Sequence, residues 1–211
     1  VGSEMCRRDR VVLTNRMSAS ASEIFAGAIQ DYGRGLVVGS QTFGKGTVQA
    51  VRPLNHGQLK ITQSKFYRVS GGSTQHKGVI PDIEIPSRID KTRIGEDALD
   101  HALPWDQIEA VPHTRYFDFS GIIDELRKRH EERFSTNPEF SLLQQEIDFL
   151  TKQRATDSVS LNLEERRAEH EQIERTRLTI ANARRELKGQ TPFESLEDLE
   201  DWQDQQAADL N

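Results

Sequence analysis

Hydrophobic positions near the start of the chain change from a strand-like run to a helix-like repeat. Residues 10–15 contain the apolar run Val-Val-Leu, which is typical of a buried strand. Residues 20–32 place apolar side chains at three- and four-residue steps, which is typical of an amphipathic helix. Gly33 and Gly35 end that helix, and residues 36–39 form a second apolar run. Because a strand, a helix and a strand in this order suit a parallel crossover, the pattern predicts one strand–helix–strand unit of an α/β core.

Alternating side chains follow, without a helical period. Residues 47–53 and 58–69 alternate in the manner of strands, and the Leu-Asn-His-Gly sequence at 54–57 between them is a turn signal. We therefore expect a β-hairpin here. Residues 79–85 predict a last strand, which Pro81 restricts to an edge or a bulge.

The chain divides into regions of different character. We interpret them as part of a folded core, a linker that wraps the core, an all-α domain and an acidic, partly disordered tail, which cover residues 1–90, 91–116, 117–190 and 191–211. Leu199 and Trp202 are the tail residues that could dock on the rest of the protein.

Three helices are expected in the all-α domain. The first covers residues 120–133, the second opens near Pro138, and the third covers Leu163–Leu187 before Gly189 ends it. Apolar side chains spaced by sevens in the third helix form a seam for an antiparallel hairpin with the second helix, and they are Ile173, Ile180 and Leu187.

Composition limits the function classes. The chain has 35% apolar and 29% charged residues, which fits a soluble protein with a modest core, and no apolar run approaches the ~18 residues of a membrane span. A net charge of −6 combines a basic excess in residues 1–90 with an acidic excess in the rest. Cys6 is the only cysteine, which excludes an internal disulfide and a cysteine-based zinc site, and the six histidines lack metal-ligand spacing. Neither a metal nor a cofactor is expected, and residues 1–9 are given no functional weight.

Three serines alternate with alanines between the first strand and the helix, and they are Ser18, Ser20 and Ser22. A serine at this corner is well placed as a nucleophile, because a helix N-terminus presents free N–H groups and a positive dipole end that suit an oxyanion. Ser20 also starts a Ser-x-x-Glu sequence with Glu23, the capping box found at many helix starts and worth about 1 kcal/mol. From local sequence a cap is the commoner interpretation, and all three hydroxyls remain candidates.

Lys45 stands between two glycines, where the backbone can bend freely and approach another segment. A lysine that acts as general base must be neutral, which requires an apolar setting, and Phe43 and Val48 could supply it. If residues 47–50 are extended, Gln49 lies on the same face and can accept from the amine without adding a charge. The alternative is an ordinary solvated loop lysine.

Residues 39–45, Gly-Ser-Gln-Thr-Phe-Gly-Lys, also satisfy most of a phosphate-binding loop. A Walker A loop requires Ser or Thr directly after the lysine and then a helix, whereas Gly46 and a β-type run follow here. Nucleotide binding is therefore a weaker alternative. A third is a non-catalytic scaffold whose helical arm binds partners.

Several segments between residues 10 and 85 together resemble a known family, and they are Ser18–Ile24, Phe43–Gln49, Lys65–Gln75, Lys77–Val79 and Pro81–Ile83. The family is that of the C-terminal processing, or tail-specific, serine proteases, which use a Ser/Lys dyad. The helical region resembles the C-terminal domain of the longer members, through less specific motifs.

The resemblance implies a fold and roles for individual residues. It implies the C-terminal half of a crotonase-like α/β protease core, followed by the all-α domain. Ser20 is then the nucleophile, Lys45 the general base and Gln49 the residue that orients the lysine. The backbone N–H of Ala21 is the expected oxyanion donor.

The resemblance also implies the setting in which the enzyme works. A PDZ domain and the first half of the core precede this region in the family, so the chain is interpreted as a fragment that is weakly active or inactive by itself. The implied substrates are proteins or peptides selected by their C-terminal ends, in a bacterial periplasm. An adaptor protein is a candidate partner, and no nucleic-acid partner is expected.

Overall fold

The computed structural model describes residues 10–208 of the 211-residue chain. Residues 1–9, which include Cys6, and 209–211 lie outside the described part. The chain divides into two compact units between His130 and Glu131, within helix α3 (Ser120–Thr136).

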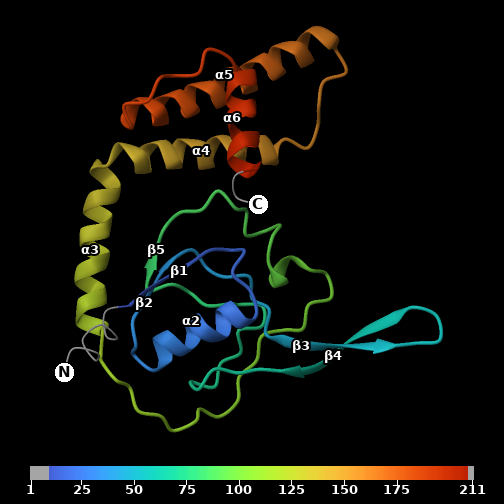
Figure 1. Ribbon diagram of the computed structural model, residues 1–211, viewed down its shortest axis with the longest axis vertical. Helices are drawn as coiled ribbons and strands as arrows, with labels where there is room; N and C mark the ends of the chain where they lie inside the picture. The colour runs from blue at the N-terminus through green and yellow to red at the C-terminus, as the bar shows by residue number, and fades with distance from the viewer. Residues whose placement is uncertain (1–9, 209–211) are drawn as a thin grey trace. The chain divides into compact units, whose positions relative to one another are not determined.

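A parallel sheet with one covering helix forms the centre of the first unit (Figure 1). Strand β1 (Val11–Thr14) leads to helix α2 (Ala21–Asp31) and then to β2 (Leu36–Gly39), which pairs with β1 in parallel. Tyr32 caps the end of α2, and Gly33 follows it with φ 60° and donates its N–H to the carbonyl of Gln30, so a glycine terminates the helix as expected. The predicted strand–helix–strand unit is confirmed.

Strand β5 (Ile83–Glu84) pairs with β2 in parallel and forms one edge of the sheet. The position at an edge was expected from Pro81, but the strand is shorter than the predicted 79–85. Val37, Val79 and Ala26, all fully buried, make the core between the sheet and α2, and Val12 packs against them.

The predicted hairpin is also confirmed, although its second strand ends at Lys65 and not at residue 69. Strands β3 (Thr47–Pro53) and β4 (Gln58–Lys65) pair antiparallel around the turn at residues 54–57 and extend away from the sheet (Figure 1). A β-bulge between Val48 and Gln49 shifts the register. Most of the hairpin is exposed, including the apolar side chains of Val48, Val51, Leu54, Leu59 and Ile61.

Residues 86–116 follow the surface of the first unit with one short 3-10 helix, η1 (Glu96–Ala98). Backbone N–H groups along this segment donate to carbonyls of the core: Glu96 to Phe43, Ile108 to Gly71, Val111 to Val69 and Tyr116 to Tyr32. These contacts are spread over the segment, so its path is fixed against the core at several points.

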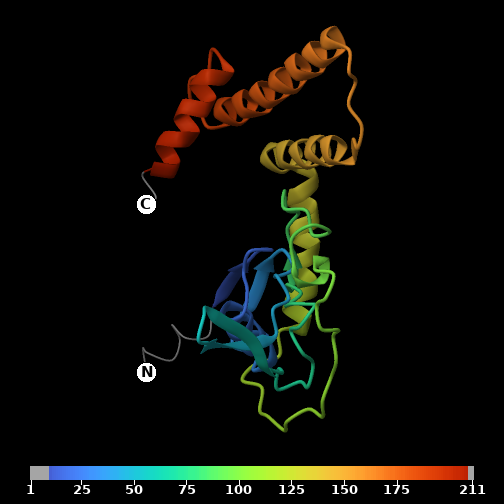
Figure 2. The same ribbon diagram turned by 90° about the vertical axis from the view of Figure 1, so that its right-hand side faces the viewer.

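Helices make up the second unit and the segment that leads into it. Helix α3 (Ser120–Thr136) is followed by α4 (Pro138–Ala155) and α5 (Leu163–Leu187), as the hydrophobic periodicity predicts. The side chains of Asn137 and Asn162 accept from backbone N–H groups and cap α4 and α5. Helix α5 runs back along α4 (Figure 2), and Arg184 pairs with Glu146 at 2.7 Å between them.

The acidic tail differs from the expected partial disorder, because α6 (Leu196–Ala208) covers much of it. Leu199 is 4% exposed, and the ring of Trp202 lies 5.9 Å from that of Phe193. These apolar side chains pack α6 against other segments, among them Phe193 after α5, although the tail is acidic. In the seam expected along α5, Ile173 and Ile180 are half-buried, whereas Leu187 is 45% exposed. None of the described helices is long and apolar enough to cross a membrane.

Candidate active site

The three candidate serines in the turn between β1 and α2 have different surroundings. The Ser18 hydroxyl accepts from the backbone N–H of Asn15 at 3.2 Å and closes the turn. Ser22 lies exposed in the first turn of α2. Ser20 stands directly before the helix, half-buried, with φ 56° and ψ −111°.

Ser20 therefore has a backbone conformation that L-residues rarely adopt. Such conformations cost about 1–3 kcal/mol and persist only where the surroundings hold them. A serine on a strained strand-to-helix turn is also the arrangement in which nucleophile elbows expose a hydroxyl. The Glu23 carboxylate helps to hold this conformation, because its Oε2 accepts from the Ser20 N–H at 2.8 Å.

Glu23 is fully buried and connects the serine turn to residues 42–46, here called the lysine loop. Its Oε2 accepts from the N–H of Lys45 at 2.9 Å as well as from that of Ser20. Its Oε1 accepts from the Thr42 hydroxyl at 2.5 Å and from the Gly44 N–H at 2.6 Å. A single carboxylate oxygen thus binds the backbones of the two residues implied as nucleophile and base.

Burial raises the pKa of the Glu23 carboxyl, because desolvation disfavours the charged form. The hydrogen bonds from Thr42, Gly44, Ser20 and Lys45 act in the opposite direction and stabilise the carboxylate. The sequence predicts for Glu23 only a place as the second half of a capping box. The Ser-x-x-Glu spacing was the signal available, but it carries no information on the loop that the same carboxylate holds.

The two glycines beside Lys45 are required by close backbone contacts. Gly44 has φ 94°, and a Cβ there would lie 2.8 Å from the carbonyl oxygen of His76. A Cβ on Gly46 would lie 2.4 Å from the backbone nitrogen of Gln75. The lysine loop therefore packs directly against residues 75–76, as close approach by glycine allows.

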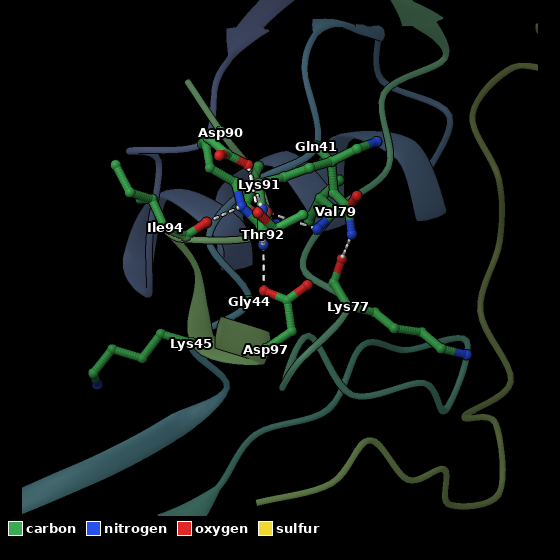
Figure 3. Close-up of polar contacts among 12 residues, drawn as sticks. Gln41, Gly44, Lys45, Lys77, Val79, Asp90, Lys91, Thr92, Ile94 and Asp97 are labelled. Atoms are coloured by element: carbon green, nitrogen blue, oxygen red, sulfur yellow. Dashed lines mark hydrogen bonds and ion pairs between the residues drawn. The ribbon is translucent and has the colours of Figure 1, made fainter. Parts of the chain in front are cut away.

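The amine of Lys45 does not reach Ser20 in this structure. Lys45 is half-buried, its Nζ donates to the carbonyl of Thr47 at 2.9 Å, and its side chain points away from the other labelled residues in Figure 3. Among the described residues, no hydrogen bond joins the side chains of Lys45 and Ser20. Val48, expected to help supply an apolar setting for the amine, is 46% exposed.

Gln49 lies apart from the lysine in the exposed hairpin. The expectation that it shares a face with Lys45 assumed regular extended backbone over residues 47–50. The bulge between Val48 and Gln49 interrupts that regularity, and none of the hydrogen bonds found for Lys45 involves Gln49. The structure thus brings together the backbones of Ser20 and Lys45 but leaves Gln49 outside.

Ala21 is the first residue of α2 and is exposed. The next N–H groups, those of Ser22, Glu23 and Ile24, donate to the carbonyls of Ala19 and Ser20. No acceptor is found within residues 10–208 for the Ala21 N–H. It is a free donor beside Ser20, at the positive end of the helix dipole.

The phosphate-binding alternative lacks structural support. A Walker A loop continues into a helix whose N-terminus faces the phosphates, whereas β3 begins two residues after Lys45. Within the described part of the chain, no three His, Cys, Asp or Glu side chains are grouped to hold a metal ion.

Two family models match the chain in succession. The model described as "Peptidase family S41" matches residues 5–85, and the model described as "C-terminal domain of tail specific protease" matches residues 89–211. The "Tail-specific protease" of Haemophilus influenzae is 42% identical over an alignment of 200 residues that covers 89% of this chain and 29% of that protein. The "Carboxy-terminal-processing protease" of Bartonella bacilliformis is 46% identical over 88 residues, 41% of this chain and 20% of that protein.

Among solved structures, the "Photosystem II D1 C-terminal processing protease" matches 36% of this chain and 20% of its own, at 43% identity and a TM-score of 0.34. The chain spans less than a third of the length of both curated relatives.

Proposed function

Since the chain belongs to the tail-specific protease family, we propose that it carries the nucleophile and the general base of a serine endopeptidase, Ser20 and Lys45. The observation that supports this assignment is the shared Oε2 of Glu23, which accepts from the N–H groups of both residues. A capping serine alone would not need a buried carboxylate that also holds a glycine-flanked lysine.

Catalysis would proceed through an acyl-enzyme. The Ser20 Oγ attacks the carbonyl carbon of the scissile peptide bond while its proton passes to the neutral Lys45 amine. The oxyanion accepts from the Ala21 N–H. The intermediate then expels the amine product, which takes the proton back from Lys45. A water molecule attacks the ester with Lys45 again as base, and this step releases the acid product and restores Ser20.

The Lys45 amine must move for this reaction, from the Thr47 carbonyl toward the Ser20 hydroxyl. A flexible four-carbon side chain allows such a movement while the backbone stays fixed. Glu23 therefore supplies the constant part of the geometry, and the lysine side chain supplies the adjustable part.

The remaining features of the family are part of the same proposal. Upstream residues would complete the substrate groove and the second oxyanion donor, and a PDZ domain would select substrates by their C-terminal ends. Gln49 would orient the Lys45 amine when another part of the full-length protein covers the hairpin. We place the enzyme in a bacterial periplasm, where an adaptor protein could deliver substrates.

Substitutions in the full-length protease test the assignment. Ser20→Ala and Lys45→Ala should each abolish cleavage of a denatured protein substrate while the circular dichroism spectrum stays unchanged. Lys45→Arg should fail too, because a guanidinium does not lose its proton at working pH. Ser22→Ala is the matched control and should cleave normally. If Ser20→Ala still cleaved and Ser22→Ala did not, Ser22 would be the nucleophile and the proposal would be refuted.

A further inference from the structure

The two family models meet between residues 85 and 89, but the structure has no separation there. Residues matched by the second model contact the lysine loop, which the first model matches. The peptidase model ends at residue 85 and the C-terminal domain model begins at 89. Residues 91–103, which fall in the second model, nevertheless lie against the lysine loop and hydrogen-bond to it directly or through buried side chains. Glu96 provides the direct contact, since its N–H donates to the Phe43 carbonyl at 2.8 Å.

Arg16 provides the second connection. It lies in the turn before Ser20 and is 2% exposed. Its Nη1 donates to the Thr42 carbonyl at 2.7 Å, while Nε donates to the Ile94 carbonyl at 2.5 Å. Its Nη2 donates to the Lys91 carbonyl at 3.2 Å and pairs with the Asp97 carboxylate. Lys91, Ile94 and Asp97 lie near one another in Figure 3.

Gln75 provides the third connection, on the other side of Lys45. It is fully buried, and its Oε1 accepts from the Gly46 N–H at 2.9 Å. Its Nε2 donates to the Glu96 carboxylate at 2.9 Å and to the Leu103 carbonyl at 3.1 Å. A buried amide with all these partners has one orientation, so the position of Gly46 depends on residues 96 and 103.

The lysine loop is thus held from two sides. Glu23 binds one side, and residues 91–103 hold the other through Glu96, Arg16 and Gln75. Neither a helix nor a strand includes residues 42–46, and their backbone groups pair partly with these side chains and partly with backbone groups of Ser18, Phe66, His76 and Val79. Loss of one partner would leave a buried polar group unpaired and allow the loop to shift.

We propose that residues 91–103, which the C-terminal domain model matches and which lie in the first unit, form a positioning element for the base of the protease, with Gln75 and Arg16 as the positioning residues. This inference rests on the proposed function of Lys45. A misplacement of about 1 Å at a catalytic group can cost about 100-fold in rate, so a small movement of the lysine loop is enough to change turnover.

The test uses Glu96→Ala and Gln75→Met in the full-length protease. Glu96→Ala removes one partner of Gln75 while the backbone contact of residue 96 to Phe43 remains. Glu96→Gln keeps an acceptor oxygen and is the conservative variant. Tyr67→Phe is the matched control, because it removes another contact to residues 86–116, the 3.0 Å hydrogen bond from Tyr67 to Asp106, away from the lysine loop.

Two measurements separate positioning from general stability. Steady-state cleavage of a peptide gives kcat and KM, and hydrogen exchange gives the protection of the amides of Gly44, Lys45 and Gly46. For Glu96→Ala and Gln75→Met we expect kcat to fall about 10- to 100-fold with KM within about twofold, and faster exchange at the three amides. Glu96→Gln and Tyr67→Phe should stay close to the parent in both measurements.

The outcomes distinguish this inference from the proposed function. Unchanged kcat and unchanged exchange in folded Glu96→Ala would overturn the inference, as would an equal loss in Tyr67→Phe. Ser20→Ala is measured in parallel. If Ser20→Ala cleaved normally, the proposed function would fail, whereas the exchange data would still report whether residues 91–103 hold the lysine loop.

Discussion

The lysine loop and the β3–β4 hairpin adjoin in the chain but are held in different ways. The loop has no regular secondary structure, yet its N–H and carbonyl groups are paired, partly with backbone groups of other segments and partly with the buried side chains of Glu23, Arg16 and Gln75. The hairpin has regular pairing and is exposed along most of its length. The irregular loop is therefore packed into the protein, whereas the regular hairpin is exposed. Lys45 lies in the packed loop, and Gln49 lies in the exposed hairpin.

The largest effect is expected from Glu23→Gln, which replaces one acceptor oxygen by an NH₂ donor. Each carboxylate oxygen accepts from at least one backbone N–H, so either orientation of the amide sets a donor against a donor. We expect the free energy of unfolding to fall by about 2–4 kcal/mol, from urea denaturation, and proteolysis to be lost. Glu84→Gln on the exposed face of β5 is the control and should change stability by less than about 0.5 kcal/mol. An unchanged midpoint in Glu23→Gln would contradict the role given to this carboxylate.

Gly46→Ala should have the next largest effect. The added Cβ would lie 2.4 Å from the Gln75 nitrogen, so the loop must move away from the segment that supports it. We expect a loss of about 1–3 kcal/mol in thermal or urea unfolding, and a lower kcat. Gly72→Ala is the control, since its Cβ would meet only the Trp105 ring at 3.7 Å. Equal behaviour of the two variants would show that the lysine loop is not tightly packed.

A pH effect of intermediate size should come from the same carboxyl. Because the pKa of Glu23 is raised in the folded protein, the folded state holds this proton more tightly than the unfolded state. The stability of the parent relative to Glu23→Gln should therefore be greatest below the ordinary pKa of 4.5 and decrease as the pH rises through the raised value. Urea denaturation of both proteins between acid and neutral pH measures this difference. A difference that grew with pH would mean that the hydrogen bonds outweigh desolvation.

Gln49→Ala should have the smallest effect on stability, within about 0.5 kcal/mol, because the side chain is exposed and outside the supported loop. In the full-length protease it should nevertheless lower kcat, if Gln49 orients the Lys45 amine when the hairpin is covered. Gln63→Ala, exposed on the neighbouring strand, is the matched control. A normal kcat in Gln49→Ala would show that Gln49 does not orient the Lys45 amine.

Local periodicity was sufficient to predict most elements. The parallel strand–helix–strand unit, the hairpin and helices α4 and α5 follow from apolar spacing, turn residues, Pro138 and Gly189, which act within a few residues of the chain. The acidic tail was less predictable, because the docking of Leu199 and Trp202 depends on apolar surface supplied by other segments.

The residues proposed for the chemistry can be named from the sequence, but the side chains that hold them cannot. Sequence reasoning named Ser20, Lys45 and Ala21, whereas the roles of Arg16 and Gln75 depend on contacts with distant residues that no local pattern contains. The register at Gln49 is shifted by a bulge, and alternation alone cannot locate such a bulge.

The Ser/Lys assignment is tested most directly by covalent labelling of the full-length protease with a fluorophosphonate, followed by peptide mass spectrometry. We expect the label on Ser20 in the parent protein and in Ser22→Ala. The rate of labelling should fall strongly in Lys45→Ala and Lys45→Arg, because neither side chain can take the serine proton. Labelling of Ser18 or Ser22, or an unchanged rate on Ser20 in Lys45→Ala, would contradict the dyad.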